Sequence, residues 1–492
     1  MRYDLIVIGR SPSGHHGALA AAKLRKRVAI VDDCAGFEYG ANQNRTVPSQ
    51  AIREAILLLT GFRHRDVIPE LFQRRRQITA AQLHSLSNEV TMQADASASA
   101  ELSEHGVEAI SGSIRFVSPH EVEVRQTSRA VRRLTSDRFL IAVGSKPVRP
   151  TWIPFDGQTV VDTDELQKLN QIPRSMIVVG GGVRGLEHAM MFAVLGADVG
   201  VVDMRTRLLE ICDREVSTHL LERAQSLGVT FHLGHEVVGI ERINNHQAAV
   251  RLDCGQRLLA DAVLIAAGRT GKTESLNLAA AGLTLDERGR LWCNEYFQSW
   301  VKHIYGVGEV VGFPAMAHLA IEQGRTAINH AFGQRTVGFQ HSPFGFFTIP
   351  EFAMIGPTEE RLRHDQIHYE VGRANFSESS RGHVSKNSDG LLKLLFARDN
   401  MQLLAVHCLG ESATELIHVG QTVMSLGGTI DYFRDSLFTA PTLAQSYRVA
   451  ANDLLERREA KPLPRTRTKR SRKSRELCAE EKMHKYVSTE SR

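Results

Sequence analysis

The stretch from Met176 to Asp203 constrains the fold more than any other part of the chain. A short apolar run, Met176–Val179, is typical of a buried parallel strand. Glycines at the GxGxxG spacing follow, then a helical run that stops at Gly196, and then a second apolar run that ends on Asp203. This order of strand, glycine turn, helix, strand and terminal acid predicts a βαβ unit that binds a dinucleotide. An ordinary βαβ unit without a ligand is the alternative.

Each part of this motif has a physical role in holding a dinucleotide. Gly180 permits the tight turn, and Gly182 allows the backbone to approach a pyrophosphate. Gly185 allows the helix to pack closely on the strand, and the amides at the helix N-terminus attract the anion. Asp203 is spaced to accept hydrogen bonds from the hydroxyls of a ribose.

The choice between NAD and NADP stays open in the sequence. Asp203 favours NAD, because a carboxylate repels a 2′-phosphate. Arg205 and Arg207 lie just beyond it and could hold a 2′-phosphate, although ordinary surface charge is the alternative.

A second, altered dinucleotide unit opens the chain. A strand at Tyr3–Ile8 leads into a glycine turn, a helix of small residues and a strand that ends on Asp32. Gly9 and Gly14 occupy the first and third glycine positions, but Ser11 occupies the second, where its Cβ would crowd a pyrophosphate. Two such units far apart in one chain suggest two nucleotides and electron transfer between them.

Composition limits the class of protein. A chain of 492 residues predicts several domains, and no apolar run is long enough to span a bilayer. Six scattered cysteines without ligand spacing are typical of reduced thiols in the cytoplasm. The net charge of +5 is misleading, because the residues from Arg457 onward contribute about +8 and leave the rest near −3. We therefore expect a body that does not bind nucleic acid, with a basic tail of unexplained role.

Six further segments are far more specific than the glycine fingerprints. They are Thr46–Ser49, Gly268–Thr273, Thr348–Glu351, His407–Glu411, Ile417–Gln421 and Pro441–Ala444 before Tyr447–Ala450. With the motif order, they resemble the flavin-dependent pyridine nucleotide–disulfide oxidoreductases. Within that superfamily the chain is most similar to the soluble pyridine nucleotide transhydrogenases, with lipoamide dehydrogenase-like enzymes as the next relatives. The resemblance covers residues 3–455.

The resemblance implies an α/β homodimer with two Rossmann-like dinucleotide-binding domains, for FAD and NAD(P), and a C-terminal α+β dimerisation domain. The implied segments are 1–150 (first part of the FAD domain), 151–267 (NAD(P) domain), 268–338 (second part of the FAD domain), 339–456 (dimerisation domain) and 457–492 (a basic, disordered tail).

The resemblance also implies which residues contact each nucleotide. Those at FAD are Gly9, Ser11, Gly14, Asp32, Gln50, Gly144, Glu309, Ala317 and His318, and those at the nicotinamide nucleotide are Gly180, Gly182, Gly185, Asp203 and Gly268. Ala317 and His318 would begin the helix that faces the flavin ring, where the helix dipole stabilises negative charge on the reduced flavin. Glu187 would lie beside the stacked flavin and nicotinamide, as the candidate catalytic residue.

The dithiol chemistry of the disulfide reductases is missing. Their two redox cysteines correspond to Ala41 and Thr46, and their C-terminal His–Glu pair corresponds to Ala440 and Gln445. No disulfide can therefore accept electrons from the flavin, and no base remains to deprotonate a thiol. Hydride exchange between nicotinamide and flavin needs neither group.

Three more departures concern the FAD half. Ser11 replaces a close-approach glycine, and Glu309 replaces an aspartate that binds FAD in relatives. Gln50 replaces a lysine that pairs, in relatives, with the acid equivalent to Glu187. We therefore expect Glu187 to lack a partner and to have a raised pKa.

Three functions are compatible with these residues. The first is an FAD-dependent transhydrogenase that exchanges hydride between NADPH and NAD⁺. The second is an NAD(P)H diaphorase that passes electrons to a quinone, a dye or oxygen. The third is a non-catalytic flavin-binding homologue. The sequence shows no metal-ligand cluster.

Overall fold

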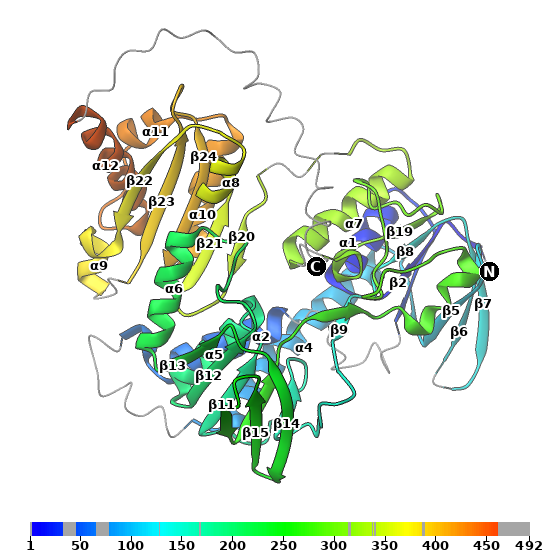
Figure 1. Cartoon of the computed structure of the whole chain (residues 1–492). Coiled ribbons are helices and arrows are strands. Elements are labelled where there is room, and N and C mark those ends of the chain that lie inside the picture. The colour runs from blue at the N-terminus through cyan, green and yellow to red at the C-terminus, as the bar shows by residue number, and fades with distance from the viewer. Residues whose placement is uncertain are drawn as a thin grey trace.

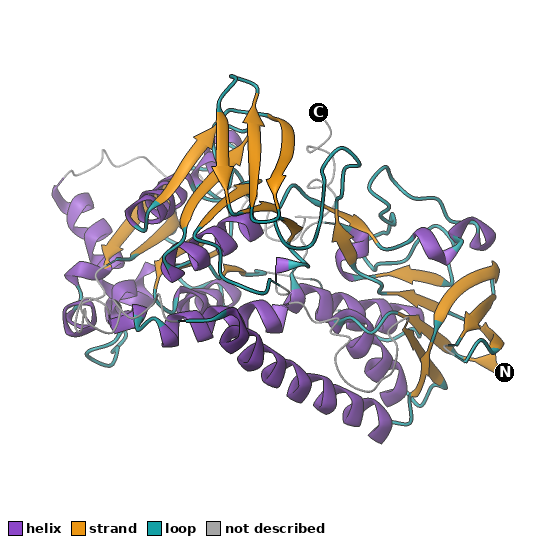
Figure 2. Ribbon diagram, turned by 90° about the horizontal axis from the view of Figure 1, so that it is seen from below, coloured by secondary structure: helices purple, strands orange, loops and turns teal. Residues whose placement is uncertain are grey.

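The computed structural model describes residues 2–32, 46–64, 78–126, 128–166, 169–312, 316–336, 338, 341–385 and 389–460, without the side chains of residues 46–48 and 64. These residues form three bodies, labelled in Figure 1, and Figure 2 shows from below that their strands gather in separate sheets. The predicted fold class, α/β with two Rossmann-like domains and a C-terminal α+β domain, is confirmed.

The N-terminal body is built on a five-stranded parallel sheet. Its strands, in spatial order, are β19 (Ile304–Gly306), β8 (Phe139–Ile141), β2 (Leu5–Ile8), β3 (Val28–Asp32) and β4 (Glu108–Ser111). Its helices are α1 (Pro12–Lys23), α2 (Thr46–Leu59), α4 (Ala80–Glu104) and α7 (Ala317–Ala331). A second sheet comprises β1 (Arg2–Tyr3), β7 (Val131–Ser136), β6 (Glu121–Arg125) and β5 (Ser113–Ser118). Every residue of β2 and β3 is buried, as expected for strands covered on both faces.

The middle body repeats this plan. Its parallel sheet has the order β10 (Val160–Asp162), β17 (Ala262–Ile265), β11 (Ser175–Val179), β12 (Asp198–Asp203) and β13 (Val229–Leu233). Its helices are α5 (Val183–Leu195) and α6 (Arg214–Ser226). An antiparallel sheet adds β14 (Val237–Asn244), β15 (Gln247–Leu252) and β16 (Arg257–Ala260). The chain returns to the N-terminal body through β18 (Arg269–Gly271), which pairs with β9 (Ser145–Pro147).

The C-terminal body is an antiparallel sheet with helices packed on it. Its strand order is β20 (Phe344–Phe346), β21 (Glu351–Ile355), β24 (Leu403–Gly410), β23 (Leu391–Ala397) and β22 (Tyr369–Asn375). Its helices are α8 (Glu359–His364), α9 (Ser380–Ser385), α10 (Ala413–Ser425), α11 (Ile430–Asp435) and α12 (Ser446–Ala460). Short 3₁₀ helices in the whole chain are η1 (Phe62–His64), η4 (Glu274–Leu276), η5 (Leu278–Ala281), η6 (Gly308–Val311), η7 (Phe376–Glu378) and η8 (Leu443–Gln445).

Two helix ends lie near predicted segments. Helix α2 begins at Thr46, and Pro48 falls in its first turn, where a missing amide costs little. Helix α12 continues to Ala460, past Arg457, where the tail was predicted to begin. Residues 461–492 lie outside the described residues, so the disordered tail stays a prediction, as do the predicted domain boundaries.

Lys393, on β23, ties the C-terminal body to the middle body. Its side chain is fully buried, and Nζ lies 2.8 Å from Oδ1 of Asp213 and 2.8 Å from Oε2 of Glu215. Nζ also pairs with Glu359 on α8. Asp213 simultaneously caps α6 by accepting from two backbone amides. Three carboxylates therefore compensate one buried ammonium, and they come from both bodies.

We expect the substitution Lys393→Met to destabilise the protein by about 3–5 kcal/mol at pH 7, because three carboxylates lose their buried cation. Burial alone would raise the pKa of Glu215, but hydrogen bonds from Arg373 and Lys393 lower it to about 2. A carboxyl whose pKa is depressed by folding contributes stability that is present above its unfolded pKa and is lost as the pH falls through its folded pKa. The deficit of the variant should therefore be full at pH 7 and smaller at pH ~3, which lies between the ordinary pKa of 4.5 and the folded value of about 2.

Urea unfolding of both proteins at the two pH values measures this deficit. The matched control is Lys146→Met, which removes an exposed ion pair in which Nζ of Lys146 lies 2.6 Å from Oε1 of Glu274. The loss of this pair should lower the free energy of unfolding by less than about 1 kcal/mol. Equal losses for the two variants would contradict the role given to Lys393.

Candidate functional site

The turn between β11 and α5 has no room for side chains at two of its glycines. Gly180 has a φ of +107°, and a Cβ there would lie 2.6 Å from the carbonyl oxygen of Ala266. A Cβ on Gly185 would lie 1.9 Å from the carbonyl oxygen of Gly180. At Gly182, in contrast, no atom lies within 4 Å of the Cβ position. The open space beside Gly182, at the N-terminus of α5, therefore fits a pyrophosphate.

Asp203, at the end of β12, accepts hydrogen bonds from neighbouring residues through both carboxylate oxygens. Oδ2 accepts from the amide of Gly181 at 2.7 Å. Arg205 donates through Nε to Oδ1 at 2.9 Å and through Nη2 to Oδ2 at 2.7 Å. A ribose hydroxyl bound at Asp203 would therefore compete with the Arg205 guanidinium for one carboxylate. Arg207 lies instead 3.5 Å from Glu360 of the C-terminal body, so only Arg205 is at the predicted ribose position.

The turn between β2 and α1 repeats the glycine constraints at its first and third positions. A Cβ on Gly9 would lie 2.5 Å from the carbonyl oxygen of Ala142, and one on Gly14 would lie 2.2 Å from that of Gly9. Ser11 is the N-cap of α1, and its Oγ accepts from the amide of Gly14 at 3.3 Å. The side chain of Ser11 therefore accepts a hydrogen bond from the amide of Gly14, which could otherwise donate to a phosphate.

Asp32 lies beside this turn, as predicted for a ribose-binding acid. It ends β3 and is buried, and its Oδ2 accepts from the backbone amide of Arg10 at 3.2 Å. The structure thus brings Gly9, Ser11, Gly14 and Asp32 to one edge of the parallel sheet, where dinucleotides bind in such folds.

Glu309 joins the N-terminal body to the start of α5. Its Oε1 accepts from Nη2 of Arg184 at 2.5 Å, and its Oε2 accepts from the hydroxyl of Ser145 and lies 3.5 Å from Nε of Arg269. The sequence predicted that Glu309 contacts FAD, but it did not predict these partners. Arg184 lies between the second and third glycines of the fingerprint, and this unusual position is the signal that could have identified it.

Glu187 lies on α5 and reaches the C-terminal body. Its Oε1 accepts from the amide of Phe347 at 2.8 Å. Burial raises the pKa of Glu187, and this bond and the charges of Arg184 and Arg53 oppose the rise only in part. The direction of this pKa shift agrees with the prediction, but the expectation that Glu187 lacks a partner is wrong, because the amide of Phe347 donates to it. Gln50 supplies no charge, and the nearby cations Arg184 and Arg53 were not predicted.

Helix α7 begins at Ala317, as the resemblance implies for the helix that faces the flavin. No side chain caps this helix. Burial lowers the pKa of His318, while a hydrogen bond from Nε2 to the carbonyl oxygen of Pro343 at 2.9 Å opposes the change. Because the lowered pKa favours the neutral form of His318, its side chain adds no full charge to the positive potential of the helix amides at this end.

Open space at three glycines fits the predicted cofactors. No atom lies within 4 Å of the Cβ position of Gly144 or Gly182, and the nearest at Gly268 stands 4.0 Å away. In addition to this open space, two acids, Asp32 and Asp203, each lie at the end of a parallel strand. The arrangement fits two dinucleotides, and the assignment of single residues to FAD or to the nicotinamide nucleotide stays a prediction.

The cysteines of the described residues form no disulfide. The resemblance implies that Ala440 and Gln445 stand at the positions of the acid–base pair of the disulfide reductases, and this stays a prediction. The four described cysteines are free, and burial raises the thiol pKa of three of them, to about 12 for Cys293. Ala41 and the side chain of Thr46, which replace the redox cysteines, lie outside the described residues.

Two groups of side chains in the described part of the chain have spacing that could suit a metal. One is the surface group of His235, Asp253 and Cys254, and the other is the set of carboxylates already bonded to Lys393. In the same part of the chain, no helix combines the length and the apolar character needed to cross a bilayer.

Two family models match this chain. Residues 3–324 match the pyridine nucleotide-disulphide oxidoreductase family, and residues 342–451 match the dimerisation domain of the same family. The prediction of FAD as cofactor and of nicotinamide nucleotides as substrates is confirmed at the level of this family.

Named relatives extend over almost the whole chain. The soluble pyridine nucleotide transhydrogenase of Mycobacterium tuberculosis is 40% identical over 93% of this chain and 98% of its own length. The protein of the same name from Colwellia psychrerythraea is 36% identical over 92% of this chain and 98% of its own length.

Two solved structures share the fold. The HOCl-induced flavoprotein disulfide reductase RclA of Escherichia coli has a TM-score of 0.80 at 22% identity, over 92% of this chain and 99% of that chain. LpdA of Mycobacterium tuberculosis has a TM-score of 0.82 at 23% identity, with the same coverage.

We expect the substitution Ser11→Gly to strengthen FAD binding about tenfold, because it frees the amide of Gly14 for a phosphate and removes a Cβ from the turn. The lost cap costs only a few tenths of a kcal/mol when glycine replaces serine. Quenching of flavin fluorescence, titrated into apoprotein, measures the affinity. An unchanged or weaker affinity would show that Ser11 does not compete with the cofactor.

Proposed function

The chain belongs to the pyridine nucleotide–disulphide oxidoreductase family, and from this premise we propose that it is an FAD-dependent transhydrogenase. Hydride passes from NADPH to NAD⁺ by way of FAD, without a redox disulfide. We further propose that the protein acts in the cytoplasm as a homodimer, since its C-terminal body matches a dimerisation domain.

The main support for a disulfide-free reaction is the pair of residues at Ala440 and Gln445. Neither side chain can exchange a proton at neutral pH, so these two positions supply no acid–base pair for thiol chemistry. The flavin supplies the atom that takes and returns the hydride. This hydride exchange needs only that the two nucleotides be bound in a fixed orientation. Relatives with 36% and 40% identity are named soluble pyridine nucleotide transhydrogenase.

The chain's own residues hold and orient the nucleotides. The turn from Gly180 to Gly185 supports the pyrophosphate, and Asp203 and Arg205 face the adenosine ribose. The Arg184–Glu309 ion pair keeps the start of α5 against the N-terminal body. Fixed geometry of this kind lowers the barrier because the reactants meet already oriented.

Two alternatives differ in where the electrons go. A diaphorase would reduce the same flavin and pass the electrons to a quinone, a dye or oxygen. A non-catalytic homologue would bind the flavin without reducing it.

Purified protein should therefore be mixed with NADPH and a thio-analogue of NAD⁺ while flavin and analogue absorbance are recorded together. We expect reduction of the analogue with repeated cycling of the flavin. Flavin reduction without transfer would support the diaphorase, and no flavin reduction would support the non-catalytic homologue. Either result would contradict the proposal.

We expect Arg205→Met to raise the KM for NADPH about tenfold, because the guanidinium is the cation nearest to a 2′-phosphate. The KM for NADH should stay unchanged or fall, since Asp203 becomes free to bind the ribose hydroxyls. Steady-state kinetics with both nucleotides measures the two values. Arg207→Met is the matched control and should change neither, because Arg207 lies beside Glu360. Equal changes in both KM values for Arg205→Met would refute a selective role.

A further inference from the structure

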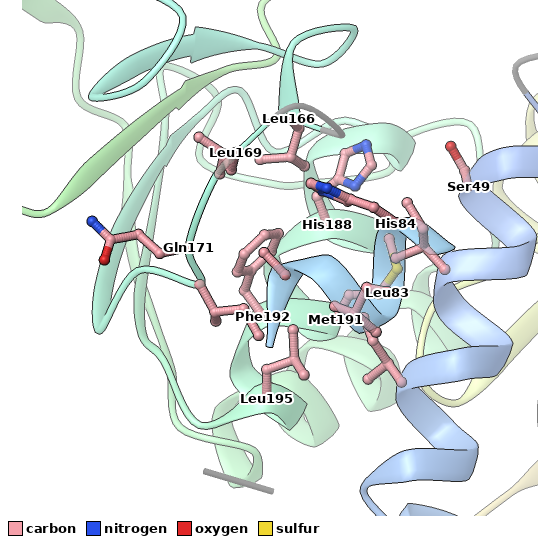
Figure 3. Close-up of a pocket in the computed structure, with 14 residues that line it drawn as sticks. Ser49, Leu83, His84, Leu166, Leu169, Gln171, His188, Met191, Phe192 and Leu195 are labelled. Carbon is pink, nitrogen blue, oxygen red and sulfur yellow. The ribbon is translucent and has the colours of Figure 1, made fainter. Parts of the chain in front are cut away.

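A histidine, an aspartate and a cysteine come together on the surface of the middle body. His235 lies in the connection between β13 and β14, and Asp253 and Cys254 lie in the turn between β15 and β16. Each residue offers one ligand atom, and these three atoms lie within 4.8 Å of one another. His235 and Asp253 are 18 positions apart, so no local spacing in the sequence indicates the group. None of the three residues lines the apolar pocket between α2, α4 and α5 that Figure 3 shows.

Backbone hydrogen bonds hold the two supporting loops in place. The amide of Asp253 donates to the carbonyl oxygen of Glu236 at 3.0 Å, which joins the turn to the residue that follows His235. The amide of Gly255 donates to the carbonyl oxygen of Leu252 at 2.9 Å and closes the turn. The ligand atoms therefore project from two backbones that are already fixed, so little ordering is needed when an ion binds.

The side-chain geometry is close to that of a tetrahedral ion site. Nδ1 of His235 lies 3.0 Å from Oδ1 of Asp253. Zinc bonds of about 2.0–2.1 Å at a tetrahedral angle would place such a nitrogen and oxygen about 3.3 Å apart. The sulfur of the exposed Cys254 has no hydrogen-bond partner among the described residues, so it is available as a third ligand. An ion would replace the existing hydrogen bond with only a small movement of the side chains.

The three kinds of ligand atom select the class of cation. Imidazole nitrogen and thiolate sulfur suit Zn²⁺, whereas Mg²⁺ and Ca²⁺ prefer oxygen ligands. The thiol of Cys254 would release its proton to solvent on binding, because the thiolate is the ligand. Since the aspartate and the cysteine are exposed, water can complete a fourth position.

We propose that His235, Asp253 and Cys254 bind one Zn²⁺ ion, with water as the fourth ligand. The ion links the connection between β13 and β14 to the turn between β15 and β16. The amides of Gly234 and His235 donate to the carbonyl oxygen of Asp203 at 2.9 and 3.3 Å, so the ion stabilises the edge of the sheet at the end of β12. The existence of this site does not depend on the proposed hydride transfer.

Competition with a chromogenic zinc indicator tests the site in the flavin-loaded, full-length protein, kept reduced by a phosphine. We expect one equivalent of Zn²⁺ whose affinity falls at least about tenfold in both Cys254→Ser and His235→Gln. Excess Mg²⁺ should not displace it. The matched control is His246→Gln, which changes an exposed histidine between β14 and β15 and should leave the affinity unchanged.

Two further measurements identify the ligands and the effect of the ion. Cobalt(II) bound in place of zinc should give a thiolate-to-cobalt charge-transfer absorption, recorded as a difference spectrum against the flavin, and Cys254→Ser should abolish it. Zinc should raise the melting temperature of the wild-type protein and of His246→Gln, but not that of Cys254→Ser.

Three results would overturn the proposal. The first is that Cys254→Ser and His235→Gln bind as much zinc as the wild-type protein, with the same affinity. The second is a cobalt spectrum that is identical in the wild-type protein and in Cys254→Ser. The third is displacement of zinc by an equal concentration of Mg²⁺, which would indicate a site of oxygen ligands alone.

Discussion

Close packing at the start of α5 is the constraint on which the other parts of the structure depend. A Cβ on Gly185 would lie 1.9 Å from the carbonyl oxygen of Gly180, so helix and strand approach as nearly as backbone atoms allow. This contact fixes the direction of α5. One turn of that helix then contacts two bodies, because Arg184 pairs with Glu309 of the N-terminal body and Glu187 binds the amide of Phe347.

Charged groups fix the middle body on both of its sides. The Arg184–Glu309 pair joins it to the N-terminal body, and the buried Lys393 joins it to the C-terminal body through Asp213 and neighbouring acids. Both junctions combine charges from different parts of the chain, and removal of one partner is costly at the buried Lys393, whereas the Arg184–Glu309 pair is partly exposed. Apolar packing of α5 on α2 reinforces the first junction, within one hydrophobic core that also reaches β20 and β21. Such an arrangement would keep the two proposed nucleotide sites in a constant relation, which the proposed hydride exchange requires.

The sequence predicted the backbone of the candidate site better than its side-chain contacts. The glycine spacings and the terminal acids Asp32 and Asp203 follow from local constraints, and the structure has each at the end of a buried parallel strand. The partners of Asp203 and Glu309 could not be predicted, because they depend on rotamers and on contacts across domains. Glu309 and Arg184 are 125 positions apart in sequence, and no local pattern links them. Ser11 was predicted in part. The sequence showed that a serine stands at the second glycine position, but it did not show that this serine is the N-cap of α1.

We propose that the flavin is the only redox group, because the resemblance implies that Ala41 and Thr46 stand where disulfide reductases have cysteines. Anaerobic titration of the purified flavoprotein with NADPH, followed by flavin absorbance, counts the electrons that each subunit accepts. We expect complete bleaching of the flavin with one equivalent of NADPH and no further uptake, since a nicotinamide delivers electrons in pairs. Uptake of a second equivalent, with a thiolate–flavin charge-transfer band, would contradict it.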